Sequence, residues 1–335
     1  MKRRKFIRNS AQAGLAFTLL GIASCVDMKP KKEVTTPTDN ADEEKPKEPF
    51  FKLSLAQWSI HRMIMEQGMN PLDFAEKAHN WGFEGLEYVN HLYAKELEKN
   101  TNSMMALDNL VKELLKRSDA NNMNNLIIMV DGEGDLASNN KKDRNTGVEN
   151  HHKWVDAAAA LGCHSIRVNL FGAEDREEWK NNSIDALSKL SEYAKGHKIN
   201  VLVENHGYLS SDAQLLTDVM KGVNMDNCGT LPDFGNFCLK RENNERWGAP
   251  CVEEYDRYKG VKELMPFAKA VSAKTYDFDD AGNETIMDYT QLLQIVKDHG
   301  YNGYIGVEYE GDRLSEEEGL IATKNLLLKS AKEVS

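Results

Sequence analysis

The feature that most constrains the fold is a regular alternation of short β-rich runs and longer helical patterns from residue 51 onward. Such alternation is typical of sheets whose parallel strands are joined by helices. The predicted strands are 52–57, 85–89, 126–130, 165–170, 200–204, 228–233, 270–274 and 304–308. The predicted helices are 71–81, 103–120, 147–161, 183–197, 212–222, 261–267, 288–300 and 315–330. Eight such units over about 280 residues predict an α/β fold, a single-domain (β/α)8 TIM barrel.

Local signals support several helix boundaries. Asn70 can cap a helix that has Pro71 in its first turn. Gly82, Gly162 and Gly300 each follow a helical stretch, where a left-handed terminal residue suits glycine. These signals divide the chain into similar repeated units, as a barrel requires.

The competing fold is a doubly wound open sheet. That fold usually carries a glycine-rich phosphate loop directly after its first strand. Here the first strand is followed by Ser59-Ile60-His61-Arg62, and the next glycine is Gly68. The sequence therefore favours the closed barrel.

The N-terminal 25 residues are typical of an export signal. A basic segment precedes a short apolar run that is too short for a stable membrane span. Arg3-Arg4 resembles a twin-arginine signal, and Ile22-Ala23-Ser24-Cys25 resembles a lipobox with Cys25 as the lipidated residue. The alternative is a general secretory signal with incidental arginines. We expect an exported protein on the periplasmic side of a bacterial membrane, anchored only through the lipid.

Residues 26–49 predict a flexible linker. They are rich in Pro, Thr, Lys and Glu and contain almost nothing apolar, so they cannot bury enough surface to offset the entropy of ordering. The predicted organisation is therefore a signal over 1–25, a linker over 26–49 and a barrel over 50–335.

The charge of the chain limits its partners. The net charge is −11, and without residues 1–24, which hold five basic residues and no acidic one, it is near −16. Such a surface repels nucleic acid phosphates. It is compatible with a small neutral ligand or one chelated by a metal.

The five cysteines include no CxxC pair. A domain of this size needs no disulfide framework. Cys238 and Cys251 could pair after export, but the interpretation we favour for the cysteines of the domain is buried free thiols.

Acidic residues follow several apolar strand runs, where the active sites of such barrels lie. Glu204, Asp233 and Glu308 end the fifth, sixth and eighth predicted strands. Buried carboxylates that converge need a positive partner, which can be a divalent cation, Lys274 or both. Carboxylates with histidine suit Mn, Co, Mg or Zn.

Other polar or aromatic residues lie near the same strand ends. Asp131 and Asn169 are weaker candidates, and His151-His152 is interpreted as helix surface. The candidate substrate-binding residues are Trp58, His61, Glu87, His91 and Asn236.

Residues 52–330 resemble the xylose-isomerase-like barrel superfamily, which includes sugar isomerases and epimerases, inosose dehydratases and an endonuclease branch. The resemblance rests on five segments: Gly82-Phe83-Glu84-Gly85-Leu86-Glu87, Glu204-Asn205-His206, Asp233-Phe234-Gly235-Asn236, Ala273-Lys274 and Gly306-Val307-Glu308.

The resemblance implies one metal held by Glu, Asp, His and Glu from strands 5, 6, 7 and 8. Glu204, Asp233 and Glu308 match three of these ligands, whereas Ser272 stands where the histidine is expected. His206 could replace the missing ligand, since it faces the same side as Glu204. Alternatively, Lys274 could neutralise the carboxylates without a metal.

The chemistry implied by the resemblance is proton transfer next to a sugar carbonyl through an enediolate. Glu204 and Glu308 would move the proton, and Lys274 or His206 would stabilise the oxyanion. The leading prediction is a metal-dependent sugar isomerase or epimerase. The alternatives are a carbon–oxygen lyase, dehydratase or hydrolase acting on keto-sugars or glycosides, and a non-catalytic sugar-binding barrel.

Action on a phosphorylated sugar and endonuclease activity are both disfavoured. Asp277, Asp279 and Asp280 follow the seventh predicted strand and make that region acidic, so it offers no clear binding site for a phosphate group. An endonuclease is the least favoured activity because of the acidic charge and the few histidines placed to bind metals.

Overall fold

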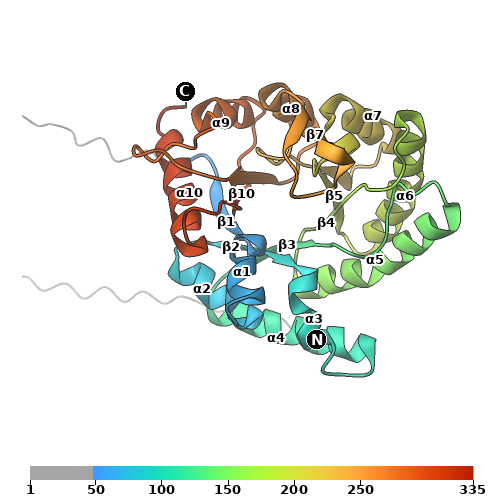
Figure 1. Cartoon of the computed structure of the whole chain (residues 1–335). Helices are drawn as coiled ribbons and strands as arrows, with labels where there is room; N and C mark the ends of the chain where they lie inside the picture. Colours follow the sequence, from blue (N-terminus) through green and yellow to red (C-terminus); the bar gives the residue numbers. More distant parts are fainter. Residues whose placement is uncertain (1–47, 335) are drawn as a thin grey trace, which may run out of the picture. The chain divides into compact units, whose positions relative to one another are not determined.

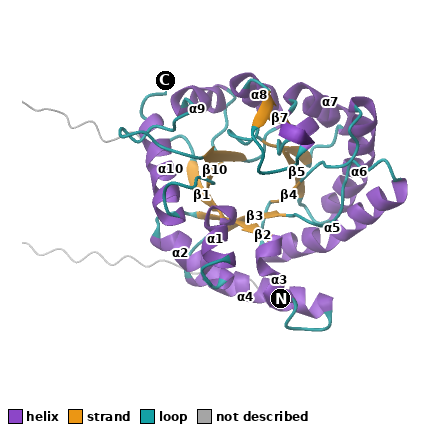
Figure 2. Ribbon diagram, in the orientation of Figure 1, coloured by secondary structure: helices purple, strands orange, loops and turns teal. Residues whose placement is uncertain are grey.

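The strands lie in an inner ring and the helices in an outer ring (Figures 1 and 2). This is a computed structural model, which describes residues 48–334. The predicted export signal and nearly all of the predicted linker lie outside the described residues. Among residues 48–334, no helix combines the length and apolar character needed to cross a bilayer.

Eight parallel strands form the inner ring. Their order is β6-β5-β4-β3-β2-β1-β10-β9. Two parallel bridges, Thr230 to Ala268 and Asp233 to Ser272, join the β6 side to the β9 side. The predicted (β/α)8 barrel is therefore confirmed. The strands are β1 Lys52–Ala56, β2 Gly85–Val89, β3 Asn124–Met129, β4 Ser165–Val168, β5 Asn200–Glu204, β6 Cys228–Leu231, β9 Val271–Thr275 and β10 Tyr304–Tyr309.

The helices form the outer ring, and polar side chains cap many of them. Asn70, Asn102, Asp212 and Ser315 are examples whose side chains accept backbone N–H groups of the first turn. The helices are α1 His61–Met65, α2 Phe74–Asn80, α3 Ala94–Leu97, α4 Ser103–Ala120, α5 Lys141–Leu161, α6 Arg176–Gly196, α7 Ala213–Val223, α8 Arg257–Leu264, α9 Tyr289–Asp298 and α10 Glu316–Ser330.

Two helices begin earlier than the sequence pattern predicts. Helix α5 begins at Lys141 and α6 at Arg176, although apolar periodicity suggested starts at 147 and 183. Their first turns are polar, so the periodic signal is missing there. Asn140 and Asp175 instead start the helices by capping two backbone N–H groups each.

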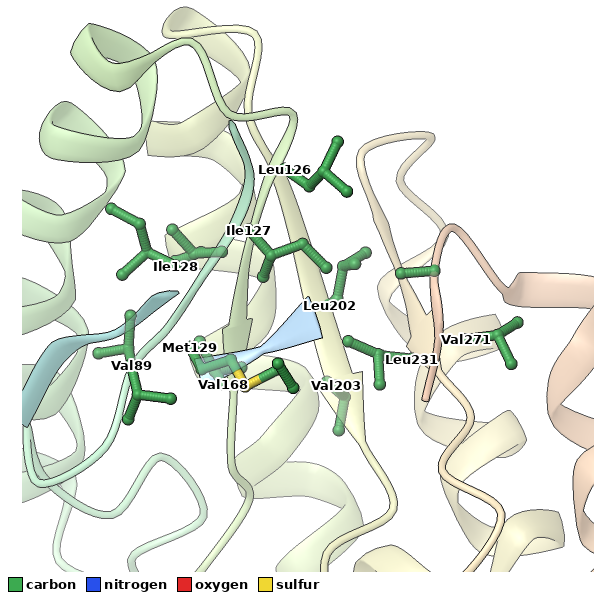
Figure 3. Close-up of a cluster of buried hydrophobic side chains, with 14 of the residues drawn as sticks. Val89, Leu126, Ile127, Ile128, Met129, Val168, Leu202, Val203, Leu231 and Val271 are labelled. Atoms are coloured by element: carbon green, nitrogen blue, oxygen red, sulfur yellow. The ribbon is translucent and has the colours of Figure 1, made fainter. Parts of the chain in front are cut away.

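The core lies between the strands and the surrounding helices, and inside the barrel below the carboxyl ends of the strands. Strand side chains are buried on both faces, as expected when helices cover a parallel sheet. Figure 3 shows part of this cluster, which includes Ile127, Met129, Leu202, Leu231 and Val271. This packing fixes the strand register and thereby the positions of the polar residues at the strand ends.

An antiparallel hairpin between β6 and α8 was not predicted. Its strands are β7 Cys238–Arg241 and β8 Cys251–Glu254. Pairing brings the Cα atoms of Cys238 and Cys251 to 5.8 Å, and a disulfide links them. The preference for free thiols was therefore wrong for this pair, because spacing in the sequence does not reveal the antiparallel pairing. Cys163 and Cys228 are buried and free.

The turn after β4 makes a close backbone contact that generates a testable prediction. Gly172 has a φ of 143°, and a Cβ there would lie 2.3 Å from the carbonyl carbon of Ala137. Gly172→Ala should lower the free energy of unfolding by about 3 kcal/mol or more, since neither backbone segment can move cheaply. Urea denaturation measures this loss.

Gly282→Ala is the matched control. Gly282 has a φ of 75° but open space around its Cα, so its substitution should cost only about 1 kcal/mol. Equal losses for the two variants would contradict the argument from close contact.

Candidate active site

The polar residues of the site come from alternate positions on strands of the barrel. Because successive side chains point to opposite faces, Ser272 and Lys274 share the inner face of β9. Glu308 on β10 lies in register with Lys274. Glu204 ends β5, and Asp233 follows β6 and bridges to Ser272. The site thus lies at the carboxyl ends of the strands.

Three carboxylates meet inside the barrel mouth. One oxygen each from Glu204, Asp233 and Glu308 lies within 4.8 Å of the others. The three residues are only 2%, 0% and 4% exposed, respectively. The strand register therefore brings together the acids that the sequence placed at separate strand ends.

Lys274 is one positive partner of this cluster. Its Nζ lies 3.1 Å from Oε1 of Glu308, 2.9 Å from Oε2 of Glu310 and 4.0 Å from Oδ2 of Asp233. Burial disfavours the charged amine, but the adjacent carboxylates raise the pKa of Lys274 well above its ordinary value. Lys274 is therefore a buried ammonium group.

Arg167 is the second positive partner, and it was missed at the sequence level. Its Nε lies 2.9 Å from Oε2 of Glu204, and its Nη1 lies 2.7 Å from Oδ1 of Asp131. The available signal was a charged residue inside the apolar run of β4, Ser165–Val168. Arg167 links the central carboxylates to Asp131 at the edge of the mouth.

Burial shifts the three central carboxyls toward their neutral forms. Desolvation, together with nearby like charge, raises the pKa of Asp233 to about 6 and that of Glu308 to about 8. It also raises the pKa of Glu204, although Arg167 opposes the shift. In contrast, Lys274 outweighs burial at Glu310 and lowers its pKa. Desolvation is thus the main reason why the three acids favour their neutral forms.

Asp233 is held rigidly. Ser272 Oγ donates to its Oδ2 at 2.6 Å, and the backbone N–H groups of Gly235 and Asn236 donate to its Oδ1 at 2.8 Å. Asn205 bonds the backbone N–H and C=O of Asp233. Ser272 therefore supplies a hydrogen bond to an acid at the position where the resemblance implies a histidine ligand.

The donor set fits a hard divalent cation. Three carboxylate oxygens converge, and two permanent cations, Lys274 and Arg167, lie beside the five acids Asp131, Glu204, Asp233, Glu308 and Glu310. Oxygen ligands of this kind suit Mg or Mn, and Zn and Co also accept carboxylates. A cation held by these oxygens would favour the charged forms of the acids, which burial disfavours.

His206 does not belong to the carboxylate cluster. Its Nδ1 lies 2.8 Å from Oδ1 of Asn169, whose amide donates to Asp131. Burial and the nearby cations lower the pKa of His206 to about 4, so the imidazole is neutral. The arrangement does not place His206 in the predicted role of replacement ligand, because His206 is not among the side chains whose ligand atoms converge with those of Asp233 and Glu308.

A cavity of about 600 Å³ adjoins the cluster, and Glu308 and Glu310 are the acids beside Lys274 that line it. The wall combines carboxylates, neutral polar groups, arginines and aromatic rings, a mixture suited to a polyhydroxylated ligand. Residues that line it include Trp58, His91, Asp131, Arg167, Asn169, Phe171, His206, Asn236, Arg241, Arg246, Trp247, Tyr276, Glu308 and Glu310.

The predicted substrate contacts divide into two groups. Trp58, His91 and Asn236 line the cavity, and Asn236 Nδ2 also donates to Oε1 of Glu204 at 3.1 Å. His61 lies outside the wall, where its ring stacks on Trp58 with 4.2 Å between centroids. Glu87 lies below the mouth, where Ser54 Oγ donates to it at 2.6 Å. Neither His61 nor Glu87 is thus placed as a substrate contact.

His151 corrects another expectation. It was interpreted as helix surface, but it is 3% exposed and lines the cavity, with Nδ1 2.7 Å from the backbone oxygen of Gly147. His151 lies four residues from Gly147 and from Val155, so it shares the buried face of helix α5 with them.

A family model described as "Xylose isomerase-like TIM barrel" matches residues 75–330. The chain belongs to this family. The match covers the strand ends that supply Glu204, Asp233, Lys274 and Glu308.

Solved structures with the same fold include several sugar epimerases. An L-ribulose 3-epimerase superposes with a TM-score of 0.62 at 15% identity, covering 84% of this chain and 96% of that one. A 3-keto-D-glucoside 4-epimerase from E. coli has a TM-score of 0.61 at 13% identity, covering 83% and 99%. The IOLI protein with a bound zinc atom has a TM-score of 0.61 at 16% identity, covering 85% and 99%.

A short segment of the chain also matches a known enzyme subunit in sequence. The "C-glycoside deglycosidase alpha subunit" of Arthrobacter globiformis is 41% identical over 49 residues. The match spans 15% of this chain and only 14% of that relative.

The buried Glu87 generates a prediction about stability. Glu87 Oε2 has no hydrogen-bond partner, and Gly306 leaves the room for this carboxyl, since a Cβ there would lie 2.6 Å from both oxygens. Burial raises the pKa of Glu87 to about 7, so the folded state prefers the neutral acid. The folded state therefore loses stability as pH rises from about 4.5 to about 7.

Glu87→Gln should remove this loss. The free energy of unfolding of the variant, relative to the parent, should rise by up to about 3 kcal/mol between pH 4.5 and 7 and then level off. Urea denaturation across this pH range measures the difference. Parallel pH profiles for the two proteins would contradict the argument.

Proposed function

We propose that the chain is an exported, metal-dependent isomerase or epimerase that acts on a keto-sugar by moving a proton next to the carbonyl. The observation that carries the proposal is the convergence of Glu204, Asp233 and Glu308, buried beside Lys274, next to a cavity of about 600 Å³ that Glu308 lines. The family of the chain and the sugar epimerases among its structural neighbours support the substrate class.

A divalent cation (Mn, Co, Mg or Zn) would be held by Glu204, Asp233 and Glu308. When bound, it would supply Lewis-acid polarisation of the carbonyl and the adjacent hydroxyl. Ser272 offers only a weak neutral oxygen, so the site would have three strong ligands. Asp233 is suited to a purely holding role because its oxygens are already fixed by hydrogen bonds.

Glu204 and Glu308 would exchange the proton, and their surroundings differ. Arg167 and Asn236 contact Glu204, and Arg167 opposes the rise in pKa that burial causes there, so Glu204 is our candidate for the base. Glu308, which lies on β10 beside Lys274, would then return the proton. An epimerase needs one group to remove the proton from one face of the substrate and a second group to return it to the other face, and these two carboxyls would fill the two roles.

Lys274 would stabilise the negative charge that develops on oxygen. Its ammonium is buried, permanently protonated and oriented by Glu308 and Glu310. A cation preorganised in a dry site stabilises a developing oxyanion more strongly than water does.

Export remains part of the proposal. The Cys238–Cys251 disulfide supports it, because such bonds persist in oxidising compartments. The proposed lipid attachment at Cys25 would hold the protein at the periplasmic side of a bacterial membrane, with the linker between the lipid and the barrel.

A second candidate is elimination from a keto-glycoside. Loss of the same proton can be followed by cleavage of the neighbouring carbon–oxygen bond, which releases the aglycone and leaves an unsaturated sugar. The local match to a C-glycoside deglycosidase subunit supports a glycoside as the substrate, but not the type of bond, since the aglycone of a C-glycoside is linked through carbon and not oxygen. Release of free aglycone, instead of an epimer, would distinguish it.

Proton abstraction is directly testable. In D2O, the metal-loaded protein should introduce deuterium next to the carbonyl of a keto-sugar such as L-ribulose or 3-keto-D-glucose, as followed by proton NMR. Glu204→Gln should slow this exchange at least about 100-fold, since the proton acceptor is lost. Glu317→Gln, an exposed change on α10, is the control. No exchange with any keto-sugar by the parent protein would refute the proposed function.

Metal binding is tested separately. The protein equilibrated with Mn2+ should retain about one ion per chain and melt at a higher temperature than after EDTA treatment. Asp233→Asn should weaken binding at least about 10-fold, because one of three anionic ligands becomes neutral. Asp218→Asn, on the exposed side of α7, should bind like the parent. Equal Mn2+ affinity of Asp233→Asn and the parent would argue against the site.

A further inference from the structure

The β7–β8 hairpin forms part of the cavity rim. Arg241 at the end of β7, and Arg246 and Trp247 in the hairpin loop, all line the cavity above the carboxylate cluster. The hairpin is not one of the eight βα units of the barrel, and Figure 1 shows it between α7 and α8. The hairpin thus lies outside the repeated units of the barrel, yet it supplies part of the cavity wall.

Trp247 completes an aromatic shelf that consists of Phe171, His206 and Trp247. Its ring centroid lies 5.9 Å from that of Phe171 and 4.9 Å from that of His206. The Arg246 guanidinium lies 4.7 Å from the Phe171 centroid. Trp247 nevertheless remains 47% exposed. A large indole that is half exposed at the edge of the cavity is available to stack on a ligand.

A second cavity lies beyond this shelf. It has a volume of about 470 Å³ and shares Phe171 and Arg246 with the first cavity. Tyr208, Lys240 and Asn244 form part of its lining. The space available to a ligand therefore continues past the shelf, over an area that a single sugar bound at the carboxylates would leave empty.

The hairpin loop is held in place by several links. The disulfide joins its two strands, and the backbone N–H of Glu242 donates to Pro250 O at 3.0 Å. Arg241 Nη1 donates to Ala249 O at 2.8 Å, and the Tyr208 hydroxyl donates to Glu245 O. A loop fixed in this way presents Trp247 without a large entropic cost on binding.

We propose that the aromatic shelf is an outer subsite for a second ring, and that the substrate is a glycoside of at least two rings. The inference rests on the proposed function, which places the reacting keto-sugar at the carboxylates. The second ring, a sugar or an aromatic aglycone, stacks through its apolar face on Trp247, and polar groups of the second cavity meet its edges.

The test compares two matched ligand pairs by isothermal titration calorimetry on the oxidised, metal-loaded protein. D-fructose is compared with lactulose, whose second ring is a sugar. Methyl β-D-glucoside is compared with phenyl β-D-glucoside, whose second ring is aromatic. At least one two-ring ligand should bind about 10-fold more tightly than its one-ring partner, and the pair that shows the difference identifies the second ring.

Trp247→Ala should reduce this affinity ratio toward one, and Val252→Ala is the control because Val252 is exposed on β8 and does not line the cavity. The double variant Cys238→Ser and Cys251→Ser should reduce the ratio partially, since the loop becomes less ordered. Melting curves of each variant verify that the barrel is folded.

Equal affinities within both pairs, an unchanged ratio in Trp247→Ala, or no binding of either two-ring ligand at 20 mM would overturn the inference. The measurement needs no turnover. Failure of the proposed function, seen as absence of deuterium exchange, is therefore distinct from failure of the subsite.

Discussion

Repulsion between buried carboxylates is the constraint on which the site depends. Glu204, Asp233 and Glu308 lie within a few ångströms of one another in a medium that screens charge poorly. Lys274 and Arg167 offset part of this repulsion, while burial, together with the neighbouring acids, raises the pKa of all three carboxyls. The barrel tolerates this because its strands are fixed by packing elsewhere. A bound cation would add positive charge at this point.

The acids at the strand ends lie next to apolar side chains from the same strands. The apolar side chains stabilise the barrel, and the acids form the site. Below the mouth, side chains such as Leu202, Leu231 and Met129 pack as an ordinary core. Two residues after Leu202 and Leu231, on the same side of the chain, lie the buried acids Glu204 and Asp233. The alternation of a strand therefore connects stability and chemistry in a single element, and a shift of one residue in register would lose both.

Much of the fold could be predicted because each repeat carries its own local signal. Apolar runs that end in Glu204, Asp233 and Glu308 identified both the strands and the acids of the site. Arg167 was missed because a long side chain inside an apolar run gives no hint of its ion-pair partners. Residues 238–254 were missed for a different reason, since this polar segment has no clear alternation and its two strands pair across a long loop.

The hairpin leaves and rejoins the barrel at one point, where Cys238 pairs with Glu254. An insertion with adjoining ends can be lengthened, shortened or exchanged without moving the strands on either side of it. Changes in the rim therefore need not disturb the carboxylates at the strand ends. The disulfide lets even this short, polar insert keep a defined shape.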